Sequence, residues 1–154
     1  MTNCVMTVFM AGLLLSIVPA AEEKKDDTKK DQEALQGTWK AVSSEQGGKE
    51  QGDEAKEHTL TFEKDTFTVK RGDQVQVKGT FKLDPSKKPK AIDMTVTESR
   101  RDEHKGKEMH GIYEMTKDGL KWCTSMPGDT DRPKEFSTKE GINHMLVTLK
   151  KDKP

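Results

Sequence analysis

The chain has 154 residues, of which 31% are apolar and 35% are charged. Lys and Arg together number 27, as do Asp and Glu, so the formal net charge is zero and no net field favours nucleic acid or an anionic membrane surface. The length fits one domain, and the low apolar fraction predicts a thin core.

The first twenty residues are predicted to form a signal peptide. No charge occurs between Cys4 and Val18, and Val18-Pro19-Ala20 provides the small residues that precede a cleavage site. The apolar run is shorter than the roughly 20 residues that span a membrane. We therefore expect cleavage after Ala20, export to the periplasm or the extracellular space, and no stable membrane span afterwards. A retained N-terminal anchor is the alternative.

A charged segment follows, and we expect residues 21–30 to form a flexible, solvated tether. The folded domain is predicted at 31–154. Asp31 is suited to cap a short helical turn that runs through Leu35, and Gly37 is suited to end it. Such a turn is placed to plug one end of a barrel.

From Gly37 onward, apolar residues recur at every second position, which is the pattern of half-buried strands. Polar stretches at 47–55, 84–90 and 99–107 separate these strands. We predict an all-β fold, an eight-stranded up-and-down antiparallel barrel, because closure leaves no exposed sheet edge. A two-sheet sandwich is the structural alternative. The candidate strands are 38–45, 58–63, 66–70, 74–83, 92–96, 109–115, 120–126 and 145–150.

Five short motifs, in this order and spacing, carry a resemblance to a known family. They are Leu35-Gln36-Gly37-Thr38-Trp39, Gly79 to Pro85, Lys88 to Asp93, Gly111-Ile112-Tyr113-Glu114 and Arg132-Pro133-x-x-Phe136. Over about residues 32 to 151 the chain resembles an uncharacterised lipocalin-like domain family of planctomycete bacteria. The resemblance implies an exported eight-stranded lipocalin-like barrel. The family has no established biochemical activity, so the resemblance transfers no catalytic residue.

Trp39 matches the tryptophan of the lipocalin Gly-x-Trp motif. The resemblance implies that this side chain closes the base of the barrel and packs beneath a cationic side chain from a late strand. Arg132 and Lys150 are the two candidates for that cation. Base closure is the favoured role of Trp39, and contact with a ligand is the alternative.

The sequence contains no recognised catalytic or metal-binding motif. Metal-ligand spacing is absent among the four histidines, His58, His104, His110 and His144. We interpret Glu108 and His110 as polar residues on the solvent-facing side of a strand rather than as an acid–base pair. No serine lies in a Gly-x-Ser-x-Gly motif, which is typical of a catalytic nucleophile. The glycine-rich segment 47–52 lacks the Lys-Ser/Thr ending of a phosphate-binding loop. The acidic segment 128–131 lacks the remaining ligand positions of a calcium-binding loop. We predict no catalytic residue, no metal and no cofactor.

Cys123 would be the one cysteine left after cleavage, since the chain has two and the other is Cys4. An intramolecular disulfide is then excluded. Its mid-strand position beside Trp122 predicts a buried, inert thiol.

An apolar stripe along the strands either lines a ligand cavity or fills the barrel. Because apolar residues are few, the filled core is favoured. The leading hypothesis is an exported, non-enzymatic binding or interaction module whose partner is a small apolar molecule or another envelope protein. Alternatives are a carrier of a small apolar ligand, a structural domain with a filled core, and, least favoured, an enzyme using Glu108, His110 or Tyr113. The candidate ligand-lining residues are Trp39, Phe62, Phe67, Val77, Phe81, Met94, Val96, Tyr113 and Trp122.

Overall fold

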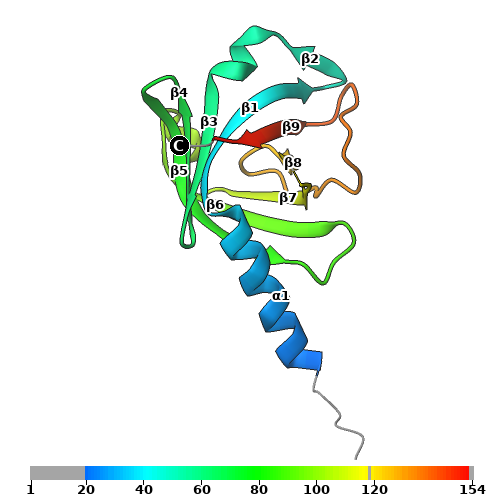
Figure 1. The fold of residues 1–154 in the computed structure, drawn as a ribbon. Coiled ribbons are helices and arrows are strands. Elements are labelled where there is room, and N and C mark those ends of the chain that lie inside the picture. The colour runs from blue at the N-terminus through cyan, green and yellow to red at the C-terminus, as the bar shows by residue number, and fades with distance from the viewer. Residues whose placement is uncertain (1–19, 118, 153–154) are drawn as a thin grey trace, which may run out of the picture.

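The computed structural model describes residues 20–117 and 119–152, and its central feature is a closed antiparallel barrel (Figure 1). Each barrel strand pairs with the next along the chain, and β1 pairs with β9 to complete the circle. The predicted eight-stranded barrel is thereby confirmed. Its strands are β1 (Gly37–Gln46), β3 (His58–Glu63), β4 (Thr66–Arg71), β5 (Gln74–Asp84), β6 (Lys90–Ser99), β7 (Glu108–Met115), β8 (Gly119–Ser125) and β9 (His144–Lys151).

The predicted loop at 47–55 contains structure that the sequence pattern did not show. Strand β2 (Lys49–Gln51) pairs only with the end of β1, and the 3-10 helix η1 (Asp53–Glu57) follows it. Both lie at the end of the barrel farthest from the N-terminal helix (Figure 1). A second 3-10 helix, η2 (Asp102–His104), lies in the loop predicted at 99–107. All three β2 side chains are exposed, so no apolar periodicity marks that strand.

The N-terminal helix α1 (Ala20–Leu35) is longer than the predicted turn. It includes the charged segment 21–30, because Ala, Glu and Lys favour helix and Lys30 pairs with Asp26 one turn earlier, at 2.6 Å. Asp31 therefore lies inside the helix rather than at its N-cap. Gly37 follows the last turn with φ of +106°, a conformation that glycine adopts without strain, as expected for the residue that ends the helix. The predicted signal peptide, 1–20, lies outside the described residues except for Ala20.

Contacts at the last turn of α1 close one end of the barrel, which we call the closed end. Trp39 is 5% exposed, and its Nε1–H donates to the carbonyl oxygen of Leu35 at 2.8 Å. Farther along the helix, the Asp31 carboxylate accepts hydrogen bonds from Tyr113 Oη and Lys90 Nζ, each at 2.7 Å. The helix is thus joined to the barrel by its C-terminal half.

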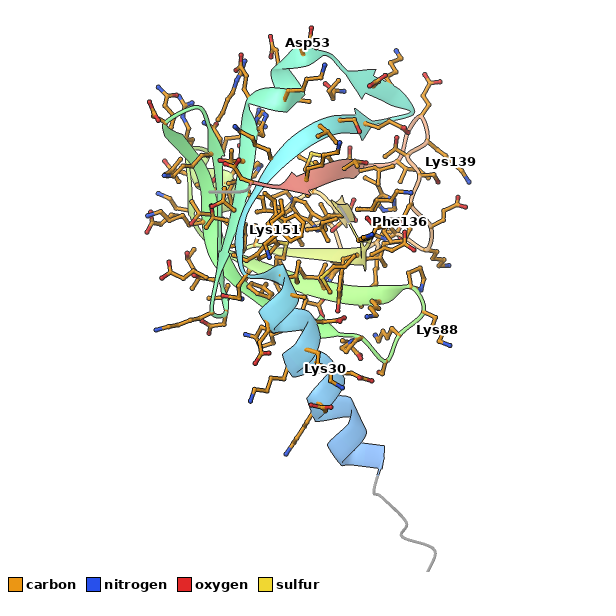
Figure 2. All side chains as sticks on the ribbon, viewed as in Figure 1. Lys30, Asp53, Lys88, Phe136, Lys139 and Lys151 are labelled. Atoms are coloured by element: carbon orange, nitrogen blue, oxygen red, sulfur yellow. The ribbon has the colours of Figure 1, made fainter. Side chains whose placement is uncertain are left out.

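The cation over Trp39 is Lys151, which is neither of the two candidates from the sequence. Its Nζ lies 5.1 Å from the centre of the indole ring, and Lys151 also donates to the carbonyl oxygen of Ala34 at 3.2 Å, above the end of α1 (Figure 2). The register explains the difference, because Trp39 pairs with Lys151 while Lys150 pairs with Lys40 and points to the opposite face. Arg132 lies on the outer wall.

Candidate functional site

The other end of the barrel, which we call the open end, contains a cavity of about 330 Å³. Residues from β1, β2, η1 and η2 contribute to its wall, so it opens on the side opposite α1 (Figure 1). The predicted filled interior therefore describes the closed end only. The apolar lining is Ala41, Ala55, Leu60, Phe67, Val69, Val77, Met109, Trp122, Met126, Pro127, Met145, Val147 and Leu149; the polar lining is Ser44, Gln46, Gln51, Glu54, His58, Thr59 and His104.

Strand register arranges one wall of the cavity in layers. At the floor, Ala41 of β1 pairs with Leu149 of β9. In the middle layer, Ser44 pairs with Val147, which in turn pairs with Trp122 of β8. Paired residues share a face of the sheet. The floor of the cavity is therefore apolar, and the next layer towards the open end contains two polar groups, the hydroxyl of Ser44 and the indole N–H of Trp122.

The most buried lining residues are apolar, the most exposed are polar, and both kinds occur between them. Leu60, Phe67 and Leu149 are at most 2% exposed, whereas Gln51 and Glu54 are exposed and the histidines are partly exposed. Among the polar lining residues, Ser44 is the buried one. The cavity is therefore apolar inside and polar at the rim, which is the usual composition of a small-molecule site.

Three of the nine candidate lining residues, Phe67, Val77 and Trp122, belong to the cavity wall. The other six do not line it. They pack in the buried core: Trp39, Phe62, Phe81, Met94, Val96 and Tyr113. Phe62 and Phe81, for example, make an edge-to-face contact with ring centres 5.0 Å apart. Sequence periodicity identifies inward-facing residues, but it does not say at which depth the barrel is hollow.

Ser44, like Gln46, is a lining residue of β1 that strict alternation places on the wrong face. Counting by two from Trp39 points Ala41 and Ser43 inward and Ser44 outward. The register between β1 and β9 shifts between Ala41 and Ser43, so Val42 is an extra residue and the alternation changes phase. Ser44 then faces the cavity. No feature of the sequence marks this bulge.

A cluster of charged and polar side chains on the barrel wall lies outside the cavity. Asp93 on β6 contacts His110 Nδ1 at 2.8 Å and an Arg132 nitrogen at 2.5 Å, and Glu108 lies 3.8 Å from His110 Nε2. Burial opposes ionisation of Asp93, but the hydrogen bonds from His110 and Arg132 outweigh it and hold the pKa of Asp93 below its usual value. None of these residues lines the cavity.

This cluster anchors the segment 126–143, which covers part of the outer wall. A second apolar row lies beneath it, in which Ala91 pairs with Ile112 and Ile112 with Cys123. All three are at most 2% exposed although they point away from the barrel interior. Arg132 holds the segment in place by donating to the carbonyl oxygen of Gly111 at 2.8 Å. We assign the cluster a structural role.

Cys123 has the environment that its position predicted. The side chain is fully buried, and its Sγ contacts the carbonyl oxygen of Ser137 at 3.8 Å. Burial raises the pKa of the Cys123 thiol to about 11. The thiol is therefore protonated and shielded at neutral pH.

A shallow groove of about 270 Å³ lies along the covering segment, where Lys139 is labelled in Figure 2. Two of its charged residues have protein partners, since Lys139 pairs with Glu135 at 3.0 Å and Arg132 with Asp93. Within 20–117 and 119–152, no group of three or more His, Cys, Asp or Glu residues is arranged to hold a metal ion.

No helix in the described part of the chain is long and apolar enough to cross a membrane. No protein-family model matches the sequence, and comparisons with curated proteins and with solved structures give no match. The resemblance to the planctomycete lipocalin-like family stays a prediction.

Proposed function

We propose that this protein is a non-enzymatic binding module that holds a small, mainly apolar molecule in the open end of its barrel. The cavity of about 330 Å³, apolar inside and polar at the rim, is the observation that supports this function. Its ionisable lining residues, Glu54, His58 and His104, are at the rim. Because no ionisable side chain of the described residues lies deep in the cavity, its wall is better suited to holding a ligand than to acid–base catalysis.

Cavity size sets the size of the ligand. An apolar cavity of about 150 Å³ accommodates benzene, so about 330 Å³ accommodates a molecule of about a dozen non-hydrogen atoms. At about 0.6 kcal/mol per atom, within the range seen for small ligands, such a molecule binds with a Kd on the order of 10 µM.

Titration with naphthalene tests this proposal, because its ten carbon atoms match the expected size. We expect saturable binding of one naphthalene per chain, measured by calorimetry. Val77→Trp places a larger side chain into the cavity and should weaken binding at least tenfold. Thr80→Trp is the matched control, because Thr80 is exposed on the same strand and does not line the cavity. It should bind as the parent does.

Urea midpoints of all three proteins, followed by circular dichroism, show whether each variant is folded. The proposal fails if the parent shows no saturable binding, or if folded Val77→Trp binds as tightly as the parent. Phe81 is unsuitable for the blocking substitution, because it packs in the core and does not line the cavity.

We also propose that the module acts outside the cytoplasm. The apolar segment before Ala20 and the small residues at 18–20 support this location. Cleavage after Ala20 would leave helix α1 complete from Ala21 onward. N-terminal sequencing of protein purified from the envelope or secreted fraction of its host should begin at Ala21. An intact Met1 on membrane-extracted protein would contradict cleavage.

A further inference from the structure

Two polar groups in the cavity wall have no hydrogen-bond partner within the described chain, and one of them is a buried atom. Trp122 is 4% exposed, and its Nε1–H is a buried donor without an acceptor. Ser44 is 9% exposed, and its side chain makes no hydrogen bond to the described residues. Buried polar groups in folded proteins are nearly always paired, so the Trp122 donor requires explanation. The Ser44 hydroxyl keeps some exposed surface in the cavity wall.

The two groups lie in the same layer of the barrel. Ser44 and Trp122 flank Val147 in one row across β1, β9 and β8, and all three residues line the cavity. Adjacent strands are about 4.8 Å apart, so the two flanking Cα atoms are separated by about 10 Å. Because Val147 lies between them on the same face, a single acceptor atom seated over Val147 has one donor on either side.

The charge of the wall selects against an ionised ligand. Neither Lys nor Arg lines the cavity. At the rim, Glu54 is paired with Arg71 at 3.2 Å, and His58 Nδ1 contacts the carbonyl oxygens of Glu54 and Ala55 at 3.2 and 3.3 Å. Carbonyl oxygens only accept, so Nδ1 carries the hydrogen and is already engaged. A buried charge would find no countercharge in the middle layer.

Resting on the proposed function, we propose that the cavity is specific for a neutral, mainly apolar molecule that carries an acceptor oxygen, such as a ketone. The oxygen accepts hydrogen bonds from Ser44 Oγ and Trp122 Nε1, while the hydrocarbon part contacts the apolar floor. Pairing these donors removes the cost of leaving them unsatisfied, which a pure hydrocarbon does not do.

Tetralin and 1-tetralone test this inference, because they share a bicyclic skeleton and differ by one carbonyl oxygen. The quantity to compare is the ratio of the Kd for tetralone to the Kd for tetralin. We expect this ratio to rise about fivefold in Trp122→Phe and in Ser44→Ala, which is the fold-change that one neutral hydrogen bond of about 1 kcal/mol produces. Ser43→Ala is the matched control, since Ser43 does not line the cavity; its ratio should equal that of the parent.

The possible outcomes separate this inference from the proposed function. If both probes bind but the ratio is unchanged in Ser44→Ala and in folded Trp122→Phe, the two groups are satisfied by water alone and the inference is wrong while the binding function stands. A rise in only one variant overturns the two-donor assignment. Tighter binding of tetralin-1-carboxylate than of tetralone overturns the preference for a neutral ligand. If neither tetralin nor tetralone binds the parent, the binding function itself fails.

Discussion

Replacing Trp39 with alanine should destabilise the whole barrel, because this side chain carries three interactions at the closed end. The indole is 5% exposed in the core, its Nε1–H donates to Leu35 at 2.8 Å, and Lys151 Nζ lies 5.1 Å from the ring centre. The hydrogen bond joins the last turn of α1 to the first strand. Loss of Trp39 therefore affects core packing and helix docking together.

The magnitude follows from these contacts. Deleting a buried large aromatic side chain costs about 3–5 kcal/mol, and this range already includes the transfer and cavity contributions. Trp39→Phe keeps most of the apolar contact but loses the hydrogen bond, so it should cost about 1–2 kcal/mol. Lys151→Met should be milder, at about 0.5–1 kcal/mol, because the ammonium group over the indole is near the surface.

Urea denaturation followed by far-ultraviolet circular dichroism measures these changes without using Trp39 as the probe. The expected order of midpoints is parent, Lys151→Met, Trp39→Phe and Trp39→Ala, from highest to lowest. A double-mutant cycle between Trp39→Phe and Lys151→Met should give a coupling of about 0.5 kcal/mol, since Phe retains a weaker cation–π contact. A Trp39→Ala midpoint equal to that of the parent would show that the closed end contributes nothing to stability, and the packing argument would be refuted.

Three further predictions concern other parts of the barrel. Gly79→Ala should cost more than about 2 kcal/mol in urea unfolding, because its Cβ would lie 2.0 Å from the carbonyl oxygen of Thr95; Gly52→Ala, which meets nothing within 4 Å, is the control, and equal midpoints would contradict the steric argument. The folded pKa of Asp93 is lowered, so its contribution to stability is present above about pH 4 and is lost as the pH falls through the folded value. The stability difference between the parent and Asp93→Asn should therefore be constant at neutral pH and shrink in acid, and a difference independent of pH would contradict it. Cys123, with its pKa raised to about 11, should react with a disulfide reagent at pH 8 about two orders of magnitude more slowly in the folded protein than in urea; equal rates would show that the thiol is accessible.

The alternation of apolar and polar residues predicts all eight barrel strands, because most strands bury one face and expose the other to water. The same rule fails where a strand is not regularly pleated. The bulge at Val42 changes the phase of β1 and turns Ser44 inward. A single extra residue in a strand leaves no mark in the composition. The inward direction of Ser44 could therefore be found only from the strand pairing in the structure.

Contacts between distant segments were likewise beyond the reach of sequence periodicity. Lys151 reaches Trp39 because of the β1–β9 register, whereas the sequence offered Arg132 and Lys150 with equal reason. The covering segment 126–143 has no regular period, and only its contacts in space explain why the outward-facing Ile112 is buried. The position of the cavity could not be predicted either. Inward-facing residues alternate with outward-facing ones in the same way in the filled half and in the hollow half of the barrel.

The position of helix α1 at the end opposite the cavity has a consequence for exchange kinetics. A ligand held in the cavity, as proposed, would enter and leave through the rim formed near η1 and η2, so its route would not cross the contacts that hold the helix to the barrel. Release then requires neither undocking of α1 nor opening of the sheet, and residence time depends on how much apolar surface the ligand buries. Substitutions around the rim would accordingly change which molecule is bound without weakening the packing that keeps the chain folded. The open end is therefore the part of the barrel where sequence changes cost the least stability.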